Sequence, residues 1–231
     1  MHDRQRALAK LTLTLRVTGV RGDGYHLLDA EMATLDLADS LTFAEGDGVE
    51  VVGADLPADD LVSRALRAVG RRAAVRLEKR IPVGAGLGGG SADAAAVLRW
   101  AGCDDVGVAA GLGADVPFCV VGGRARVTGV GEIVRPLPFV HATYTVLTPP
   151  FPVSTPAVYR AWDDLGGPTA DGPNDLEPAA LRVEPRLAAW RDRLGDATGR
   201  VPVLAGSGGT WFVEGAFPDV PGAVVTRTDR P

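Results

Sequence analysis

The chain has 231 residues, a formal net charge of −5 at pH 7, 46% hydrophobic residues and 23% charged residues. These proportions are ordinary for a soluble globular protein, and the length suggests one large domain or two small ones. The sequence has no basic tract and no apolar run near the roughly 20 residues that span a bilayer, so we expect no nucleic-acid partner and no membrane span. The two cysteines, Cys103 and Cys119, lack metal-ligand spacing, which favours a reducing, cytoplasmic location.

The basic residues are almost all arginine, because Lys10 and Lys79 are the only two lysines. Asn174 is likewise the only asparagine, and Gln5 is the only glutamine. Where the composition uses arginine at every position that either lysine or arginine could fill, the few remaining residues of these rare types become candidates for positions that need their particular chemical group. The alternative is that they are leftovers of the same bias.

Residues 9–17 alternate between apolar and polar side chains, which predicts a strand. The apolar side chains at alternate positions of residues 11–17 are expected to face the core, whereas Lys10, Thr12 and Thr14 share the other face. Further strands are expected at 28–37, 40–43 and 75–78. A helix is expected over residues 61–69, with Asp59 and Asp60 at its start.

A turn at residues 22–24 separates the first two of these strands and leads into Tyr25 and His26. An aromatic ring beside an imidazole suits stacking on a pyrimidine and hydrogen bonding to it. The simpler alternative is a turn with a half-buried tyrosine and a surface histidine.

Five of the seven residues from 84 to 90 are glycine, and they lie between the strand at 75–78 and a helix that Ser91 is expected to cap. Glycine lets backbone N–H groups approach a ligand closely, and the first N–H groups of a helix favour an anion. This arrangement predicts a phosphate-binding loop.

Three alternatives fit this glycine-rich segment less well. A P-loop has a lysine before its serine, and here Gly90 precedes Ser91. The dinucleotide fingerprint follows a nearly all-apolar strand, whereas this strand carries Arg76 and Glu78. A plain surface turn does not need five glycines before a helix.

The second half of the chain shows a proline-dense crossover at residues 148–152 and helical patterns at 155–165 and 187–194. Strands are expected at 125–130, 201–204, 210–213 and 223–227, with a glycine-rich connection at 205–209. Asp115, in Gly-Ala-Asp-Val-Pro-Phe, taken alone predicts a turn or capping residue.

Several of these segments resemble the GHMP kinase superfamily. They occur in the family's order: Ala9-Lys10, Asp23-Gly24-Tyr25-His26, residues 82–93, residues 113–118 and residues 205–209. The triple glycine before Ser91 and the segment at 23–26 are most similar to the branch of 4-diphosphocytidyl-2-C-methyl-D-erythritol kinases. The chain departs from the pattern at Thr12, where the family has asparagine, and at Ala205, where it has serine.

The resemblance implies an α+β fold with two domains. Residues 1–145 would form an N-terminal α/β domain that carries the nucleotide loop, and residues 146–231 a C-terminal ferredoxin-like domain, with a cleft between them. It also implies an ATP-dependent phosphotransferase that phosphorylates the 2-hydroxyl of 4-diphosphocytidyl-2-C-methyl-D-erythritol in the non-mevalonate route to isoprenoids. Two alternatives stay open: a GHMP-type kinase with another acceptor, and a nucleotide-binding relative without catalysis.

By the same resemblance, Asp115 is the catalytic acid–base group, and Lys10 lies beside it and stabilises the developing alkoxide. ATP and Mg²⁺ are the expected cofactors, and a small molecule with a cytidine diphosphate moiety is the expected partner of a monomer or weak homodimer. The expected substrate-binding residues are Thr12, Asp23, Tyr25 and His26. The expected ATP-binding residues are Pro82, Val83, Gly84, Ala85, Gly86, Leu87, Gly88, Gly89, Gly90, Ser91 and Ala92.

Overall fold

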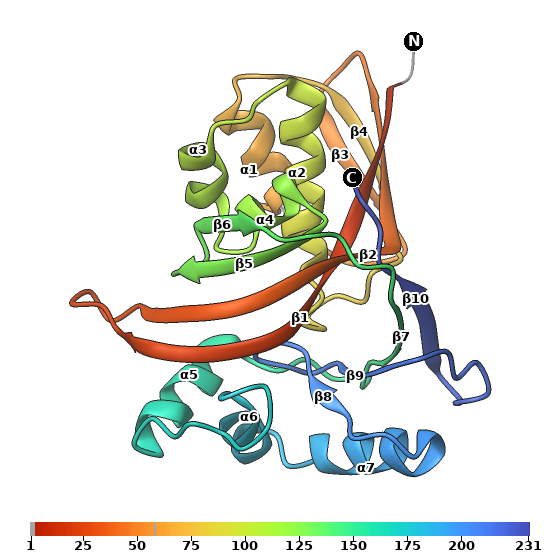
Figure 1. The fold of residues 1–231 in the computed structure, drawn as a ribbon. Helices are drawn as coiled ribbons and strands as arrows, with labels where there is room; N and C mark the ends of the chain where they lie inside the picture. Colours follow the sequence, from red (N-terminus) through yellow and green to blue (C-terminus); the bar gives the residue numbers. More distant parts are fainter. Residues whose placement is uncertain (1–2, 58) are drawn as a thin grey trace.

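The computed structural model describes residues 3–57 and 59–231 and contains two β-sheets with helices packed on them (Figure 1). In the larger sheet the strand order is β3-β4-β2-β5-β6, and β1 pairs with β2. All its pairings are antiparallel except β3 with β4. Its strands are β1 (Asp3–Val20), β2 (His26–Ala44), β3 (Gly48–Val52), β4 (Ala74–Glu78), β5 (Arg124–Gly129) and β6 (Ile133–Pro136).

The smaller sheet is antiparallel, with the strand order β10-β7-β9-β8. Its strands are β7 (Thr143–Leu147), β8 (Val203–Leu204), β9 (Trp211–Glu214) and β10 (Ala223–Arg227). The first four helices gather beside the larger sheet and the last three beside the smaller one (Figure 1). The helices are α1 (Leu61–Ala68), α2 (Gly89–Ala101), α3 (Val106–Leu112), α4 (Val116–Val121), α5 (Thr155–Asp164), α6 (Glu177–Val183) and α7 (Leu187–Thr198). The mixed architecture confirms the expected α+β class.

The long pair β1 and β2 runs across the molecule and connects its two hydrophobic clusters (Figure 1). Leu11 of β1 belongs to the cluster under α1 to α4, and Leu15 belongs to the cluster that packs against α5 to α7. The strand predicted at residues 9–17 is confirmed, although it is longer than expected. Register shifts next to Lys10 and Thr12 interrupt the regular pairing, and such bulges change the direction in which side chains point.

The prediction of two separate strands at 28–37 and 40–43 is wrong, because β2 is continuous through both segments. The sequence between them contains Asp39, a charged residue that is unusual in a strand interior. Asp39 is 1% exposed, and its carboxylate accepts hydrogen bonds from the backbone N–H groups of Arg80 and Ile81. These contacts allow a buried charge within a continuous strand.

Helix caps account for several of the predicted helix starts. Asp60 precedes α1, and its carboxylate accepts a hydrogen bond from Ser63 N at 2.9 Å. Ser154 caps α5 in the same way, ahead of Thr155 and Pro156, and Pro is well suited to the first turn because it lacks the N–H group. The helices expected at 61–69 and 155–165 are therefore confirmed to within about one residue at each end.

The single asparagine has a structural reason. Asn174 is 1% exposed, and its amide nitrogen donates to Leu204 O at 2.8 Å and to Gly206 O at 2.7 Å. Its amide oxygen accepts a hydrogen bond from Leu176 N at 2.9 Å. An aspartate cannot donate these two bonds, so this position needs an amide that both donates and accepts. Asn174 thereby fixes the start of the connection at residues 205–209.

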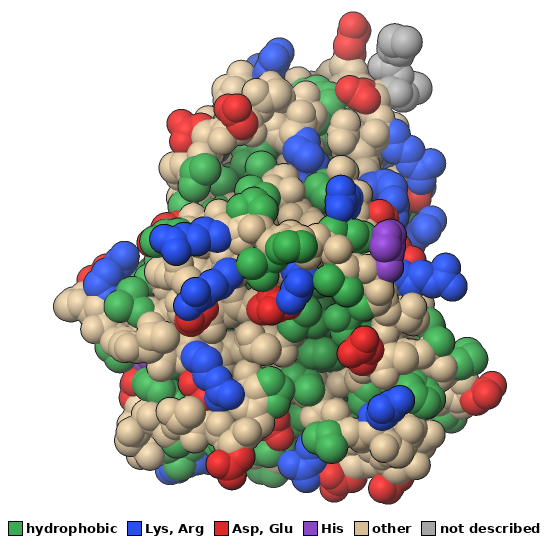
Figure 2. All heavy atoms as spheres, in the orientation of Figure 1, with side chains coloured by type: hydrophobic (Ala, Val, Ile, Leu, Met, Phe, Trp, Pro, Cys, Tyr) green, Lys and Arg blue, Asp and Glu red, His purple; other side chains and the backbone are tan. Residues whose placement is uncertain are grey.

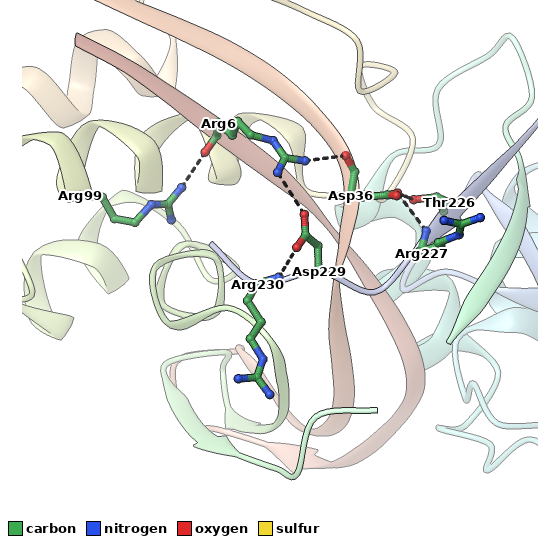
Figure 3. A network of polar contacts seen from close by, with 7 residues as sticks. All are labelled: Arg6, Asp36, Arg99, Thr226, Arg227, Asp229 and Arg230. Carbon is green, nitrogen blue, oxygen red and sulfur yellow. Dashed lines mark hydrogen bonds and ion pairs between the residues drawn. The ribbon is translucent and has the colours of Figure 1, made fainter. Parts of the chain in front are cut away.

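The C-terminal segment lies against β1 and β2 and links the two sheets (Figure 3). Arg6 Nη1 forms an ion pair with Asp229 Oδ2 at 3.1 Å, and Asp36 accepts a hydrogen bond from the Thr226 hydroxyl at 2.5 Å. On the other side, Arg99 of α2 donates to Arg6 O at 3.0 Å. These polar contacts hold α2, β1 and the end of β10 as neighbours.

Basic and acidic side chains occur together across the face shown in Figure 2. Ion pairs between such side chains include that of Arg124 with Glu31 at 2.7 Å. Within residues 3–57 and 59–231, none of the helices is long and apolar enough to cross a membrane.

Candidate active site

The glycine loop, defined here as residues 82–88, runs between the end of β4 and the start of α2. Gly84, Gly86 and Gly88 have φ angles of +70°, +77° and +68°, a region that glycine enters without steric cost. A Cβ on Gly86 would lie 2.6 Å from Gly208 O. The glycine loop therefore packs directly on the glycine-rich connection of the smaller sheet.

Helix α2 begins at Gly89, so the expectation that Ser91 caps it is wrong. Gly88 is the N-cap, and it supplies no side-chain hydrogen bond to the first turn. Gly88, Gly89, Gly90 and Ser91 all line the adjacent cavity. The N–H groups of this turn are consequently left for an anion, which the positive end of the helix dipole also favours.

Lys10 and Asp115 meet in the cavity from two different elements. Lys10 Nζ, on β1, lies 3.4 Å from Asp115 Oδ2, just ahead of α4, and donates a hydrogen bond to Thr12 Oγ1 at 3.1 Å. The Lys10 side chain is 6% exposed, whereas that of Asp115 is 33% exposed. A buried ammonium thus lies beside a carboxylate that a ligand can reach.

The Lys10 side chain passes between two glycines. A Cβ on Gly88 would lie 2.7 Å from Lys10 Cγ, and one on Gly206 would lie 3.6 Å from Lys10 Nζ. The backbone of Lys10 also donates to Leu87 O at 3.0 Å. The glycine loop and the connection at 205–209 therefore meet at this one side chain.

Asp115 lies in a turn, as its local sequence alone predicted, but its side chain caps no helix. It occupies the N-cap position of α4 but makes no side-chain capping bond. The Tyr159 ring of α5 lies close enough for the negative charge of Asp115 to affect the pKa of its phenol. Burial raises the pKa of the Tyr159 phenol, and the negative charge of Asp115 raises that pKa further. Asp115 is thus available for chemistry, with α5 beside it.

His26 is held in place by α5. Its Nε2 lies 2.9 Å from Asp163 Oδ1, its ring packs on Tyr159 with centroids 4.6 Å apart, and Trp162 contacts it edge-on at 5.6 Å. Because a carboxylate only accepts hydrogen bonds, Asp163 favours the tautomer with hydrogen on Nε2. The other ring nitrogen of a neutral His26 is then an acceptor.

Tyr25 and Asp23 lie at the tip of the β1–β2 hairpin. Tyr25 is 61% exposed and lines the cavity, and the Arg21 guanidinium lies over its ring, 5.5 Å from the centroid. The Asp23 carboxylate binds that same guanidinium, with its closest contact at 2.7 Å. Asp23 therefore positions Arg21 and the turn, and Tyr25 offers an accessible ring face.

One cavity of about 760 Å³ brings most of the expected residues together. It extends from the glycine loop, past Lys10 and Asp115, to Tyr25 and His26. The expected residues that line it are Lys10, Thr12, Tyr25, His26, Pro82, Val83, Gly84, Ala85, Gly86, Gly88, Gly89, Gly90, Ser91 and Asp115.

Three expected residues, Asp23, Leu87 and Ala92, are not among the described residues that line this cavity. Leu87 and Ala92 are each 1% exposed and belong to the hydrophobic core. They hold the glycine loop and α2 against the core from behind.

The residues on α5 were missed by the sequence analysis. Tyr159, Arg160 and Asp163 line the cavity, but the sequence indicated only a helix at this place. No local pattern distinguishes these side chains from an ordinary helix surface, because His26, which contacts Tyr159 and Asp163, is more than 130 residues away in the chain. Lys79, noted only as a rare lysine, also lines the cavity.

The chain also matches known proteins. Residues 60–123 match the family described as GHMP kinases N terminal domain. The 4-diphosphocytidyl-2-C-methyl-D-erythritol kinase of Paracoccus denitrificans (strain Pd 1222) is 40% identical over 238 residues, covering 92% of this chain and 86% of the relative. The 4-diphosphocytidyl-2-C-methyl-D-erythritol kinase of Rhodopseudomonas palustris (strain ATCC BAA-98 / CGA009) is 38% identical over 259 residues, covering 90% of this chain and 87% of that relative.

Solved structures agree with these relatives. A crystal structure of 4-(cytidine 5'-diphospho)-2C-methyl-D-erythritol kinase matches with a TM-score of 0.81 and 34% identity, over 98% of this chain and 100% of that one. A mevalonate kinase structure matches with a TM-score of 0.57 at 12% identity, over 99% and 98% of the two chains, and so shares the fold. Fold and site together define a GHMP kinase. Within that superfamily, the chain belongs to the 4-diphosphocytidyl-2-C-methyl-D-erythritol kinase family.

We predict that Gly88→Ala lowers kcat, because the new Cβ would displace the Lys10 side chain. A misplacement of about 1 Å at a reacting group can cost about 10²-fold in rate. Gly102→Ala is the matched control, since Gly102 has the same φ of +68° with nothing within 4 Å of its Cβ position. Both variants should lose about 1–2 kcal/mol of stability from backbone strain. Steady-state kinetics and thermal unfolding of both variants test this, and equal kcat values for the two would contradict it.

Proposed function

We propose that this chain is an ATP-dependent kinase that phosphorylates the 2-hydroxyl of 4-diphosphocytidyl-2-C-methyl-D-erythritol in the non-mevalonate route to isoprenoid precursors. The observation that carries the proposal is the Lys10–Asp115 pair, which lies in one cavity with the glycine loop and with His26. The family membership supports the same reaction and the use of ATP.

The residues of the cavity have different roles in the proposed reaction, according to their positions. The N–H groups at the start of α2 hold the phosphates of the nucleotide, which supplies the phosphoryl group when bound. Asp115 accepts the proton of the attacking hydroxyl, and Lys10 stabilises the negative charge that develops on its oxygen. Phosphoryl transfer depends mainly on such positioning and charge neutralisation.

Mg²⁺ is part of the proposal, as the ion that neutralises the nucleotide phosphates. Residues 3–57 and 59–231 contain no group of three or more His, Cys, Asp and Glu side chains suited to hold a metal. Mg²⁺ does not need such a group, because it commonly uses one or two protein oxygens together with phosphates and water. Ser91 and Asp115 line the cavity and carry oxygens of the required kind.

At the other end of the cavity, Tyr25 and Tyr159 offer aromatic rings, and His26 offers a hydrogen-bond acceptor held by Asp163. Cytosine has two flat faces and an exocyclic amino group that donates hydrogen bonds. These groups match, so we place the cytidine of the substrate here. Arg160, which also lines the cavity, is a cation available for the diphosphate.

We further propose a cytoplasmic enzyme that is a monomer or a weak homodimer, with the domain division near residue 145. Both cysteines are free thiols, in keeping with a reducing compartment. The two hydrophobic clusters support two structural units, although β1 contributes residues to both.

The deciding experiment measures ADP release by the purified protein with ATP, Mg²⁺ and 4-diphosphocytidyl-2-C-methyl-D-erythritol, beside homoserine, mevalonate and galactose as other acceptors. We expect turnover with the cytidine-linked substrate alone. Turnover with another acceptor would replace the proposed substrate. No turnover with any acceptor, from protein that binds ATP, would favour a non-catalytic nucleotide-binding protein.

We predict that Asp115→Asn lowers kcat by about 10²–10⁴-fold, the usual effect of losing a general base, while ATP still binds. Asp105→Asn is the matched control, because Asp105 makes a capping bond to Gly107 N at the start of α3, away from the cavity. It should keep wild-type turnover. A folded Asp115→Asn enzyme with near wild-type kcat would remove Asp115 from its proposed role.

We also predict that Tyr25→Ala raises the KM for the cytidine-linked substrate far more than the KM for ATP. Stacking on a base is worth about 1–3 kcal/mol, which corresponds to roughly 5- to 150-fold. Val20→Ala serves as control, since Val20 is 52% exposed on the same hairpin and lies outside the cavity lining. If the KM for ATP rose instead, Tyr25 would belong to the nucleotide end.

A further inference from the structure

The two lysines of this arginine-rich chain line the same cavity, and only Lys10 has a place in the proposed reaction. The Lys79 side chain is 4% exposed. Its ammonium forms ion pairs with Asp39 of β2 and, at 2.6 Å, with Asp93 of α2. Both carboxylates are buried, with 0% and 2% of their side chains exposed. A cluster of three buried charges therefore lies beside the nucleotide end of the cavity.

Asp39 connects this cluster to the upstream end of the glycine loop. One carboxylate oxygen of Asp39 binds Lys79, and the other accepts hydrogen bonds from Arg80 N and from Ile81 N, the latter at 2.8 Å. The backbone just before the loop is thus fixed to β2. Both carboxylate oxygens of Asp39 are engaged by the lysine or by the approach to the loop.

Asp93 connects the cluster to the downstream end of the loop. It belongs to the second turn of α2, and its Oδ2 accepts the Lys79 hydrogen bond. Among the described residues, its buried Oδ1 has no hydrogen-bond partner. Burial raises the pKa of Asp93, and the negative charge of Asp39 raises it further against the opposing effect of Lys79. Keeping the Asp93 carboxylate charged at this position therefore costs free energy.

The position also explains why this cation is a lysine. A Cβ on Gly89, the first residue of α2, would lie 3.2 Å from Lys79 Nζ and 3.1 Å from Ile81 Cγ2. The ammonium is thus packed against the helix start, where a planar guanidinium is too wide. Lysine gives a compact charge that two carboxylates can share.

Stability alone is a poor reason for such a cluster. Replacing buried ion pairs with apolar residues is often neutral or stabilising, because desolvation offsets the attraction between the charges. We propose that Lys79, Asp39 and Asp93 form a clamp that joins the two ends of the glycine loop and positions the loop and the first turn of α2 for the nucleotide phosphates. Lys79 is then a positioning residue. This inference rests on the proposed function in taking the loop as the ATP site.

The test compares Lys79→Met and Lys79→Arg with the wild type in steady-state kinetics, thermal unfolding and calorimetric binding of ADP. We expect both variants to raise the KM for ATP and the Kd for ADP by about tenfold or more, as for a misplaced phosphate-binding group. The KM for the cytidine-linked substrate should stay within about twofold, because its subsite lies on α5 and the hairpin. If Lys79→Arg is impaired as Lys79→Met is, then a positive charge alone is not sufficient at this position, and the compact shape of the lysine ammonium is needed.

Asp175→Asn is the control for a general loss of stability. Asp175 is buried and pairs with Arg16 at 2.6 Å, but it lies outside the cavity lining. Its variant should unfold at a lower temperature without raising the Kd for ADP. If Lys79→Met does not fold, the Asp93→Asn variant tests the clamp instead, because it keeps the Lys79–Asp39 ion pair, which has no net charge. It should raise the Kd for ADP by about threefold or more, since hydrogen bonds to charged groups are stronger than neutral ones.

An unchanged Kd for ADP in a folded Lys79→Met or Asp93→Asn protein would overturn the clamp, and so would an equal rise in the KM of both substrates. These results differ from a failure of the proposed function. In that case the wild type itself would bind no ADP or would show no turnover with the cytidine-linked substrate.

Discussion

The contact between Lys10 and Asp115 is the interaction on which the rest of the site depends. The ammonium is nearly enclosed, and burying an unpaired charge is expensive, so Asp115 at 3.4 Å and the Thr12 hydroxyl at 3.1 Å are required partners. The side chain reaches them only because Gly88 has no Cβ in its way, and Gly206 lies in contact distance of its ammonium. One lysine thereby sets the relative positions of β1, the glycine loop, the start of α4 and the connection at 205–209.

Local patterns in the sequence were sufficient for β1, which carries Lys10, and for the glycine loop that lies against this lysine. Alternation predicted β1, and the run of glycines predicted the loop between β4 and α2. The start of α2 was placed three residues too late, because Ser91 looks like a cap, whereas Gly88 is the N-cap. β2 was divided at Asp39, because a charge inside a strand is destabilising unless a distant partner compensates it, and Lys79 is 40 residues away. The expected boundary near residue 145 stays a prediction.

Residues that depend on long-range contacts were not predictable in the same way. Tyr159 and Asp163 are recognised as site residues through their contacts with His26, which reaches them only in the folded chain. The composition nevertheless contained useful information, since the rarity of lysine and asparagine marked Lys10, Lys79 and Asn174. Each of these three has a buried side chain whose hydrogen bonds or geometry the commoner arginine or aspartate does not reproduce. The short helices α3 and α4, with seven and six residues, have too few turns to give a periodic signal.

The central claim is that Lys10 acts on the reacting atoms, and Lys10→Arg tests it most directly, because the charge is kept while its position changes. The account predicts that ATP and the cytidine-linked substrate still bind, while kcat at saturating substrates falls by about 10²-fold. Thermal unfolding of the same preparation shows whether the variant is folded. A folded Lys10→Arg protein with unchanged kcat would contradict the account, because Lys10 would then serve only as a structural ion-pair partner of Asp115.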